Sequence, residues 1–210
     1  MQVAGLCFPI VSKGSPEDLE VKLSDLVLGC LKVTFKNCVT RVDRDALGYI
    51  RYEVNDFRHL LKIALTLKAL VRSETKRADL RQSLGVTSSL LNKNMGVESQ
   101  LFTQMEKNIY KQKRDNITLV TPNSNISERF SITLRFIDAF MSTYTVTVAK
   151  VMYCYLTSPT RRYEPIAKRA DLGKQSLSKF LVSGRHVLID DAIEEFNSSV
   201  KLSSLVTKYL

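Results

Sequence analysis

The segment between residues 161 and 185 concentrates cationic side chains. It holds seven basic residues against two acidic ones, a local charge of +5, and all 210 residues together carry +10. Clustered lysine and arginine side chains neutralise phosphate groups, and this term dominates the affinity of proteins for nucleic acids. Half of the net charge therefore lies on a segment whose residue types suit a polyanion.

The apolar residues of this segment recur at the spacing of two short helices that cross closely. Residues 164–182 read EPIAKRADLGKQSLSKFLV, with a proline suited to a first helical turn. The residues expected to face inward are Ile166, Ala167, Ala170, Leu172 and Leu177. Asp171 stands at the turn, where glycine is usual, and aspartate tolerates a left-handed backbone better than most residues. This pattern resembles the helix-turn-helix of bacterial and phage DNA-binding regulators.

The resemblance implies that residues 173–182 form a helix that enters the major groove of double-stranded DNA. The side chains that would meet base edges are Lys174, Gln175, Ser176, Ser178 and Lys179. The side chains that would contact phosphates are Arg161, Arg162, Lys168, Arg169 and Arg185. A short wing strand is expected over 185–189. The alternative is an ordinary three-helix turn with a solvated basic face.

Residues 75–95 resemble the same motif less closely. Thr75 is expected to cap a helix over 76–84, Gly85 is the expected turn residue, and a further helix follows. Arg81 stands where a small residue is wanted. The residues that would face DNA from this second helix are Ser88, Ser89, Asn92 and Lys93. The alternative is a degenerate copy of the motif that serves packing or dimerisation.

The string Lys-Arg-Ala-Asp-Leu occurs twice, at 76–80 and at 168–172. The two copies fall in different registers of the motif, since the first lies within an expected helix and the second spans the turn. We interpret the match as a coincidence rather than as a repeat.

Residue types for other chemistries are sparse. The four cysteines show no C-x-x-C spacing, and the two histidines lie far apart in the sequence, so no metal site is expected. No Walker A loop, dinucleotide-binding glycine pattern or G-x-S-x-G motif occurs. We therefore expect neither a cofactor nor enzyme activity.

The remaining chain reads as short strands and helices. Strands are expected over 7–11, 32–42, 49–54 and 116–120, and helices after Ser15, over 56–74 and over 97–115. Apolar residues from 130 to 155 then alternate in steps of four and three, as in a heptad seam. A dimerisation helix would show this spacing. We favour two ordinary core helices with a break near 142–147, where β-branched residues crowd.

The expected fold is mainly α with minor β, built from tandem, winged helix-turn-helix-like units. The expected organisation is a small α+β segment at 1–55, a first helix-turn-helix-like unit at 56–122 and a second unit with C-terminal helices at 123–210. The expected function is sequence-specific binding of double-stranded DNA by a cytoplasmic transcription regulator, with a homodimer or the first unit supplying a second half-site. The alternatives are a plasmid or phage replication initiator or partition protein, and a protein-interaction adaptor that does not bind DNA. No membrane segment is expected.

Overall fold

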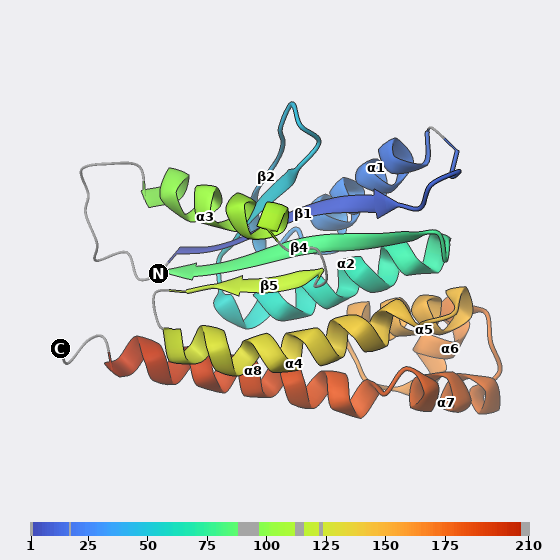
Figure 1. The fold of residues 1–210 in the computed structure, drawn as a ribbon. Coiled ribbons are helices and arrows are strands. Elements are labelled where there is room, and N and C mark those ends of the chain that lie inside the picture. Colours follow the sequence, from blue (N-terminus) through green and yellow to red (C-terminus); the bar gives the residue numbers. More distant parts are fainter. Residues whose placement is uncertain (1, 17, 88–96, 112–115, 122–123, 207–210) are drawn as a thin grey trace.

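The computed structural model describes residues 2–16, 18–87, 97–111, 116–121 and 124–206. It is mainly α-helical and contains one mixed sheet, so the expected mainly α class with minor β is confirmed (Figure 1). The sheet lies among helices of the N-terminal half, and a layer of C-terminal helices packs beneath it in the view of Figure 1.

Five strands form the sheet in the order β2-β3-β1-β4-β5. They are β1 Gln2–Val11, β2 Val39–Arg44, β3 Ile50–Val54, β4 Ala78–Thr87 and β5 Ile117–Val120. The first four pair antiparallel and β5 joins β4 in parallel. With α1 Leu19–Val33 and α2 Leu60–Glu74 between them, β1 to β4 follow the split βαβ arrangement. The sheet thus takes strands from both sides of the boundary expected at residue 55.

The two faces of the sheet contact different helices. Because side chains alternate along a strand, Val3 and Cys7 of β1 join the main core, which includes α1 and α2, while Ala4 and Leu6 pack with α3 Val97–Lys111. Gly85 in β4 lets α3 approach closely, since a Cβ there would lie 2.7 Å from the Met105 sulfur. Helices therefore cover both faces of the central strands.

Five helices complete the part of the chain that the structure describes. They are α4 Ser124–Ser142, α5 Val146–Thr157, α6 Tyr163–Ala170, α7 Lys174–Ser183 and α8 His186–Val206. The apolar series runs along α4 and α5, and its members are all buried: Phe130, Leu134, Ile137, Met141, Tyr144, Val148, Val151 and Tyr155. Between the helices, the Thr145 hydroxyl accepts from the Val148 amide at 3.2 Å and caps α5. The interpretation as two core helices is confirmed.

The helix expected over 76–84 is wrong, because these residues enter β4. Thr75 is extended, with φ −161° and ψ 146°, and ends α2. Leu80 and Leu84 are four residues apart, a spacing that places them on one face of either a helix or a strand. Pairing with β1, where Pro9 opposes Leu80 and Gly5 opposes Leu84, decides for the strand. The first helix-turn-helix-like unit is therefore not formed over these residues.

Other expectations need smaller corrections. The wing strand expected over 185–189 is wrong, since His186 already begins α8. The strand expected over 32–42 is displaced, because α1 continues to Val33 and β2 begins at Val39. The strand expected over 49–54 and the strand expected over 116–120 appear as β3 and β5.

A buried ionic network joins the sheet to the C-terminal helices. Lys68 of α2 is fully buried, and its Nζ lies 2.5 Å from Asp79 Oδ1 and 2.7 Å from Asp138 Oδ1. Ser142 Oγ accepts from Lys68 Nζ at 3.0 Å and donates to Asp79 Oδ2 at 2.7 Å. A charge buried this deeply is tolerated only when it is paired and hydrogen-bonded, so the network fixes α2, α4 and β4 relative to one another.

Candidate nucleic-acid interface

The turn between α6 and α7 is tight and left-handed. Asp171 has φ 58° and ψ 52°, the αL conformation expected of it. The Leu172 amide donates to the Ala167 carbonyl at 3.0 Å and closes the end of α6. Gly173 returns to extended backbone and precedes the first residue of α7. Two helices of eight and ten residues thus follow each other across a three-residue turn.

The residues expected to face inward do so. Ile166 and Leu177 are fully buried, Ala167 and Ala170 nearly so, and Leu172 is half-buried against the same core. The small Ala167 and Ala170 let α6 lie close to its neighbours, and α5, α6 and α7 all contact one another. The apolar pattern of residues 164–182 was therefore a correct guide to local packing.

The polar residues of α7 point mostly outward. Lys174, Gln175, Ser176 and Lys179 are exposed, and Ser178 is half-buried. Lys174 and Lys179 make no ion pair with any part of the chain that the structure describes. The first turn of α7 thus presents ammonium, amide and hydroxyl groups to solvent.

The five expected phosphate-contacting residues divide into two groups. Arg162, Lys168 and Arg185 are exposed and have no ion pair with the described residues. Arg161 and Arg169 are bonded within the protein. Arg169 donates to the Thr157 hydroxyl at 2.9 Å and to the Cys154 carbonyl at 3.4 Å, so it ties α6 to the end of α5. Only the first group is free for an anionic partner.

Arg161 belongs to a cluster that the sequence did not indicate. Its guanidinium donates to the Tyr155 carbonyl at 3.0 Å and to Asp190 Oδ1 at 2.8 Å, and it lies 4.0 Å from the centre of the Tyr155 ring. The Tyr155 hydroxyl donates to Asp190 Oδ2 at 2.5 Å. Burial, and next the bond to Asp190, raise the pKa of Tyr155. Burial, and next the positive charge of Arg161, lower the pKa of Lys62 in α2.

This cluster holds the α5–α6 connection against α8. Its members come from positions 155, 161 and 190, and no sequence motif joins them. The sequence signal that could have pointed to it is the pair of adjacent arginines, Arg161 and Arg162, that follows the buried helix α5. The sequence does not show which of the two bonds within the protein. The consequence is that Arg161 positions the α6–α7 pair instead of projecting from it.

The second helix expected to face DNA lies outside the described residues. Its candidate residues were Ser88, Ser89, Asn92 and Lys93.

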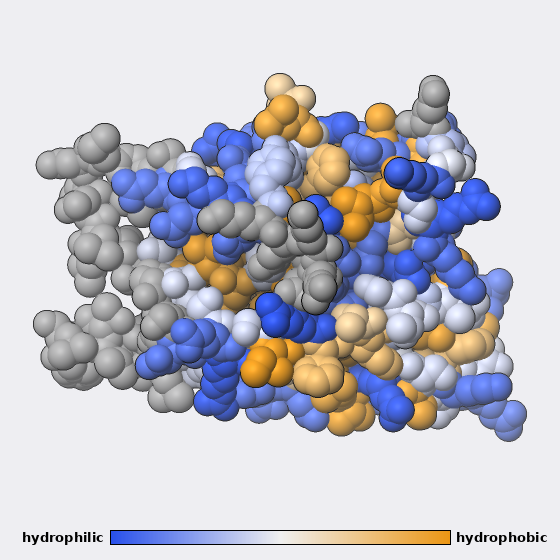
Figure 2. Space-filling model, in the orientation of Figure 1, coloured by the Kyte–Doolittle hydropathy of each residue, from blue (hydrophilic) through white to orange (hydrophobic). Residues whose placement is uncertain are grey.

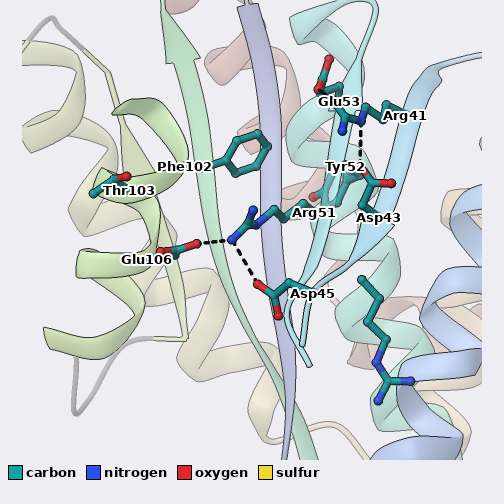
Figure 3. Close-up of a pocket in the computed structure, with 10 residues that line it drawn as sticks. Arg41, Asp43, Asp45, Arg51, Tyr52, Glu53, Phe102, Thr103 and Glu106 are labelled. Carbon is teal, nitrogen blue, oxygen red and sulfur yellow. Dashed lines mark hydrogen bonds and ion pairs between the residues drawn. The ribbon is translucent and has the colours of Figure 1, made fainter. Parts of the chain in front are cut away.

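A large hollow of the described surface lies elsewhere, between the β2–β3 hairpin and α3, with a volume of about 520 Å³ (Figure 3). Arg51 points into it, where its Nη2 lies 3.1 Å from Asp45 Oδ2 and 2.5 Å from Glu106 Oε1. Its guanidinium also lies 5.6 Å from the centre of the Phe102 ring. Sequence reasoning missed this hollow, because its residues come from three separate elements.

The arginines of this large hollow are matched by carboxylates. Arg41 pairs with Asp43 at 2.6 Å and with Glu53 at 3.8 Å, and Arg44 pairs with Asp25 at 3.5 Å. These ion pairs leave no cationic excess to attract a phosphate. No group of three metal-ligating side chains occurs among the described residues, and the four carboxylates around the hollow form none. The large hollow is therefore polar but internally compensated.

Comparison with known protein families, curated proteins and solved structures finds no match for this chain. Within the described ranges, no helix combines the length and apolar character needed to cross a membrane.

Proposed function

We propose that the chain binds double-stranded DNA sequence-specifically through α7, as a transcription regulator. The first turn of α7 would enter the major groove, where Gln175 suits adenine and Lys174 suits guanine or phosphate. Arg162, Lys168 and Arg185 would contact phosphates on either side. Arg161 and Arg169 have no direct part in this proposal, because their donors are used inside the protein.

One observation carries the proposal: the exposed, unpaired polar face of α7 belongs to a helix pair whose turn is closed by backbone hydrogen bonds and whose inward residues are buried. Uncompensated lysines on a rigid helix can bind phosphates without first breaking ion pairs of their own.

The test is the salt dependence of binding to random-sequence duplex DNA, measured by fluorescence anisotropy. We compare the wild type with the triple variant Lys174→Ala/Gln175→Ala/Lys179→Ala. Each lost phosphate contact reduces the steepness with which log affinity falls against log salt by about 1. The slope of the triple variant should therefore be shallower than that of the wild type by up to about 2. A selection from random duplexes then finds the preferred sequence, which the variant should no longer prefer.

The matched control is Lys32→Ala/Lys36→Ala/Gln104→Ala, which removes the same side chains from exposed positions on α1, after it and on α3. It should bind DNA with the wild-type slope. Equal losses in both triple variants would show a nonspecific charge effect and contradict a role for α7. No binding by the wild type at low salt would contradict DNA binding altogether, and a protein partner would then be sought.

A single recognition helix covers too little DNA for tight specific binding, so a second half-site is needed. The strand at Ala78–Thr87 replaces the helix expected in the first helix-turn-helix-like unit, so that unit no longer serves as a source of the second half-site. We therefore include self-association in the proposal. The mass of the protein–DNA complex, measured by analytical ultracentrifugation, should correspond to two chains per site.

A further inference from the structure

A small hollow lies at the end of the sheet where β1 ends and β4 begins. Its volume is about 160 Å³, and it is lined by Ile10, Val11 and Ser12, by Arg72 of α2, and by residues 76–79. The Ser12 amide donates to the Arg77 carbonyl at 2.8 Å, which holds the two chain segments together. Hydrophilic side chains are frequent along this end of the molecule, from β1 down to α7 (Figures 1 and 2).

The cations of this small hollow are not matched by acids. Arg72, Lys76 and Arg77 line it, with Asp79 as the one lining carboxylate. Both oxygens of Asp79 are already occupied. Oδ1 accepts from Lys68 Nζ at 2.5 Å and Oδ2 accepts from the Ser142 hydroxyl at 2.7 Å. Lys76 and Arg77 are exposed and form no ion pair with the residues that the structure describes.

Arg72 adds a buried positive charge. It is 8% exposed, and its two terminal nitrogens donate to four backbone carbonyls, those of Lys76, Ala78, Ser142 and Tyr144. Its third nitrogen, Nε, is buried and has no partner in the described structure. Carbonyls satisfy donors but do not cancel a net charge, so the guanidinium keeps its attraction for an anion.

A chain of hydrogen bonds connects the small hollow to the end of α7. Arg72 reaches the carbonyls of Ser142 at 2.6 Å and Tyr144 at 3.1 Å, in the turn between α4 and α5. The Tyr144 hydroxyl in turn donates at 2.7 Å to the carbonyl of Gly184, directly after α7. The small hollow and the α6–α7 pair are therefore held in one frame.

We propose that the small hollow binds a phosphate group. Guanidinium, ammonium and the Ser12 hydroxyl are donors suited to phosphate oxygens. The fixed connection to α7 favours a backbone phosphate of the same duplex, beyond the bases that α7 reads, and this choice of source rests on the proposed function. Free phosphate is the other source of the same chemistry. The large hollow beside Arg51 does not qualify, because its arginines are paired with carboxylates.

The test uses the full chain and the variant Lys76→Ala/Arg77→Ala, with Lys32→Ala/Lys36→Ala as the control that removes two exposed cations elsewhere. Both substituted side chains of the test variant are exposed, so its circular dichroism spectrum should match the wild type. The first measurement is the melting temperature in inorganic phosphate against chloride at equal ionic strength. Phosphate should raise it in the wild type and the control, and not in the test variant.

The second measurement separates the two sources. Salt slopes are compared on a duplex of about one helical turn and on one of about three turns. With a backbone phosphate as ligand, the test variant loses up to about 2 from the slope on the long duplex and nothing on the short one. With free phosphate as ligand, the melting shift is seen but both slopes stay at wild type, which overturns the DNA source.

The phosphate site would be overturned if Lys76→Ala/Arg77→Ala changed neither the phosphate-dependent rise of the melting temperature nor the salt slope on either duplex. The failure of the proposed function gives a different result. In that case the wild type binds neither duplex, whereas the phosphate-dependent rise of its melting temperature and the loss of that rise in the test variant remain.

Discussion

The chain contains the same five residues, Lys-Arg-Ala-Asp-Leu, in two different structures. At 76–80 the string forms a turn and the first three residues of β4. At 168–172 it forms the last turn of α6 and the left-handed corner before α7. The alanine is buried in both copies, whereas the aspartate bonds a buried lysine in the first and turns the chain in the second.

The neighbours of each copy decide its structure. The first copy follows the extended Thr75 and pairs with β1, with Val11 opposite Ala78 and Ile10 opposite Asp79. The second continues a helix that has a proline in its first turn and packs on α5. The local conformational preference of five residues is weaker than their interactions with β1 or with α5. The string therefore takes the conformation that the neighbouring element stabilises.

The largest difference between the copies should appear at the aspartates. Asp79→Ala removes one of the two carboxylates that pair with the fully buried Lys68, and it should lower the free energy of unfolding by about 3–5 kcal/mol. Asp171→Ala should cost far less, because Asp171 is exposed. Urea denaturation of the two variants measures this, and equal losses would contradict the buried network.

The leucines should differ next. Leu80 is fully buried in the sheet core, and Leu80→Ala should lower the free energy of unfolding by at least about 2 kcal/mol. Leu172 is half-buried under the turn, so Leu172→Ala leaves a smaller cavity and should cost less than half as much. Thermal and urea unfolding check the pair. A larger loss at Leu172 would mean that the turn, and not β4, anchors the fold.

The adjacent cations of the second copy should separate stability from binding. Arg169→Ala should lower the free energy of unfolding by about 1 kcal/mol through its lost bond to Thr157, and should leave the DNA salt slope near wild type. Lys168→Ala should leave stability unchanged and lower the slope by about 1. The reverse assignment would show that Arg169 leaves its internal bonds to bind DNA.

The smallest predicted effect is a gain in stability. Asp171 occupies a left-handed conformation that glycine adopts without steric cost, so Asp171→Gly should raise the free energy of unfolding by up to about 1 kcal/mol. The matched change Asp79→Gly should be strongly destabilising, since it removes a carboxylate that pairs with the buried Lys68 and also places glycine within a strand. A loss of stability in Asp171→Gly would indicate that the carboxylate itself supports the turn.

Much of the secondary structure could be predicted from the sequence, and two short segments are the clearest exceptions. Strands at 49–54 and 116–120, the pair of core helices after 124 and the turn at Asp171 all follow from local residue types. Residues 76–84 and 185–189 do not. At 76–84 the apolar spacing fits a strand as well as a helix, and only the distant partner β1 decides between them. At 185–189, His186 begins α8 and its ring packs on that of Tyr155 in α5, with the ring centres 5.4 Å apart.

The candidate site shows the same limit at the level of single side chains. The sequence correctly separated the inward residues of α6 and α7 from Lys174 and Lys179, since helical periodicity fixes both sets. It did not separate Arg161 from Arg162. That distinction depends on Asp190, which lies 29 positions away and meets Arg161 only in the folded chain.

The continuous core has a consequence for cooperativity. One set of mutually packed apolar residues extends from Val3 in β1 to Val200 in α8 and includes Ile166 and Leu177 beneath the proposed recognition helix. Opening α7 therefore exposes part of the core that also supports the sheet, so the two should open together. The backbone amides of α7 should then exchange hydrogen for deuterium about as slowly as those of β4, and a mutation in the sheet should weaken DNA binding by depleting the folded population.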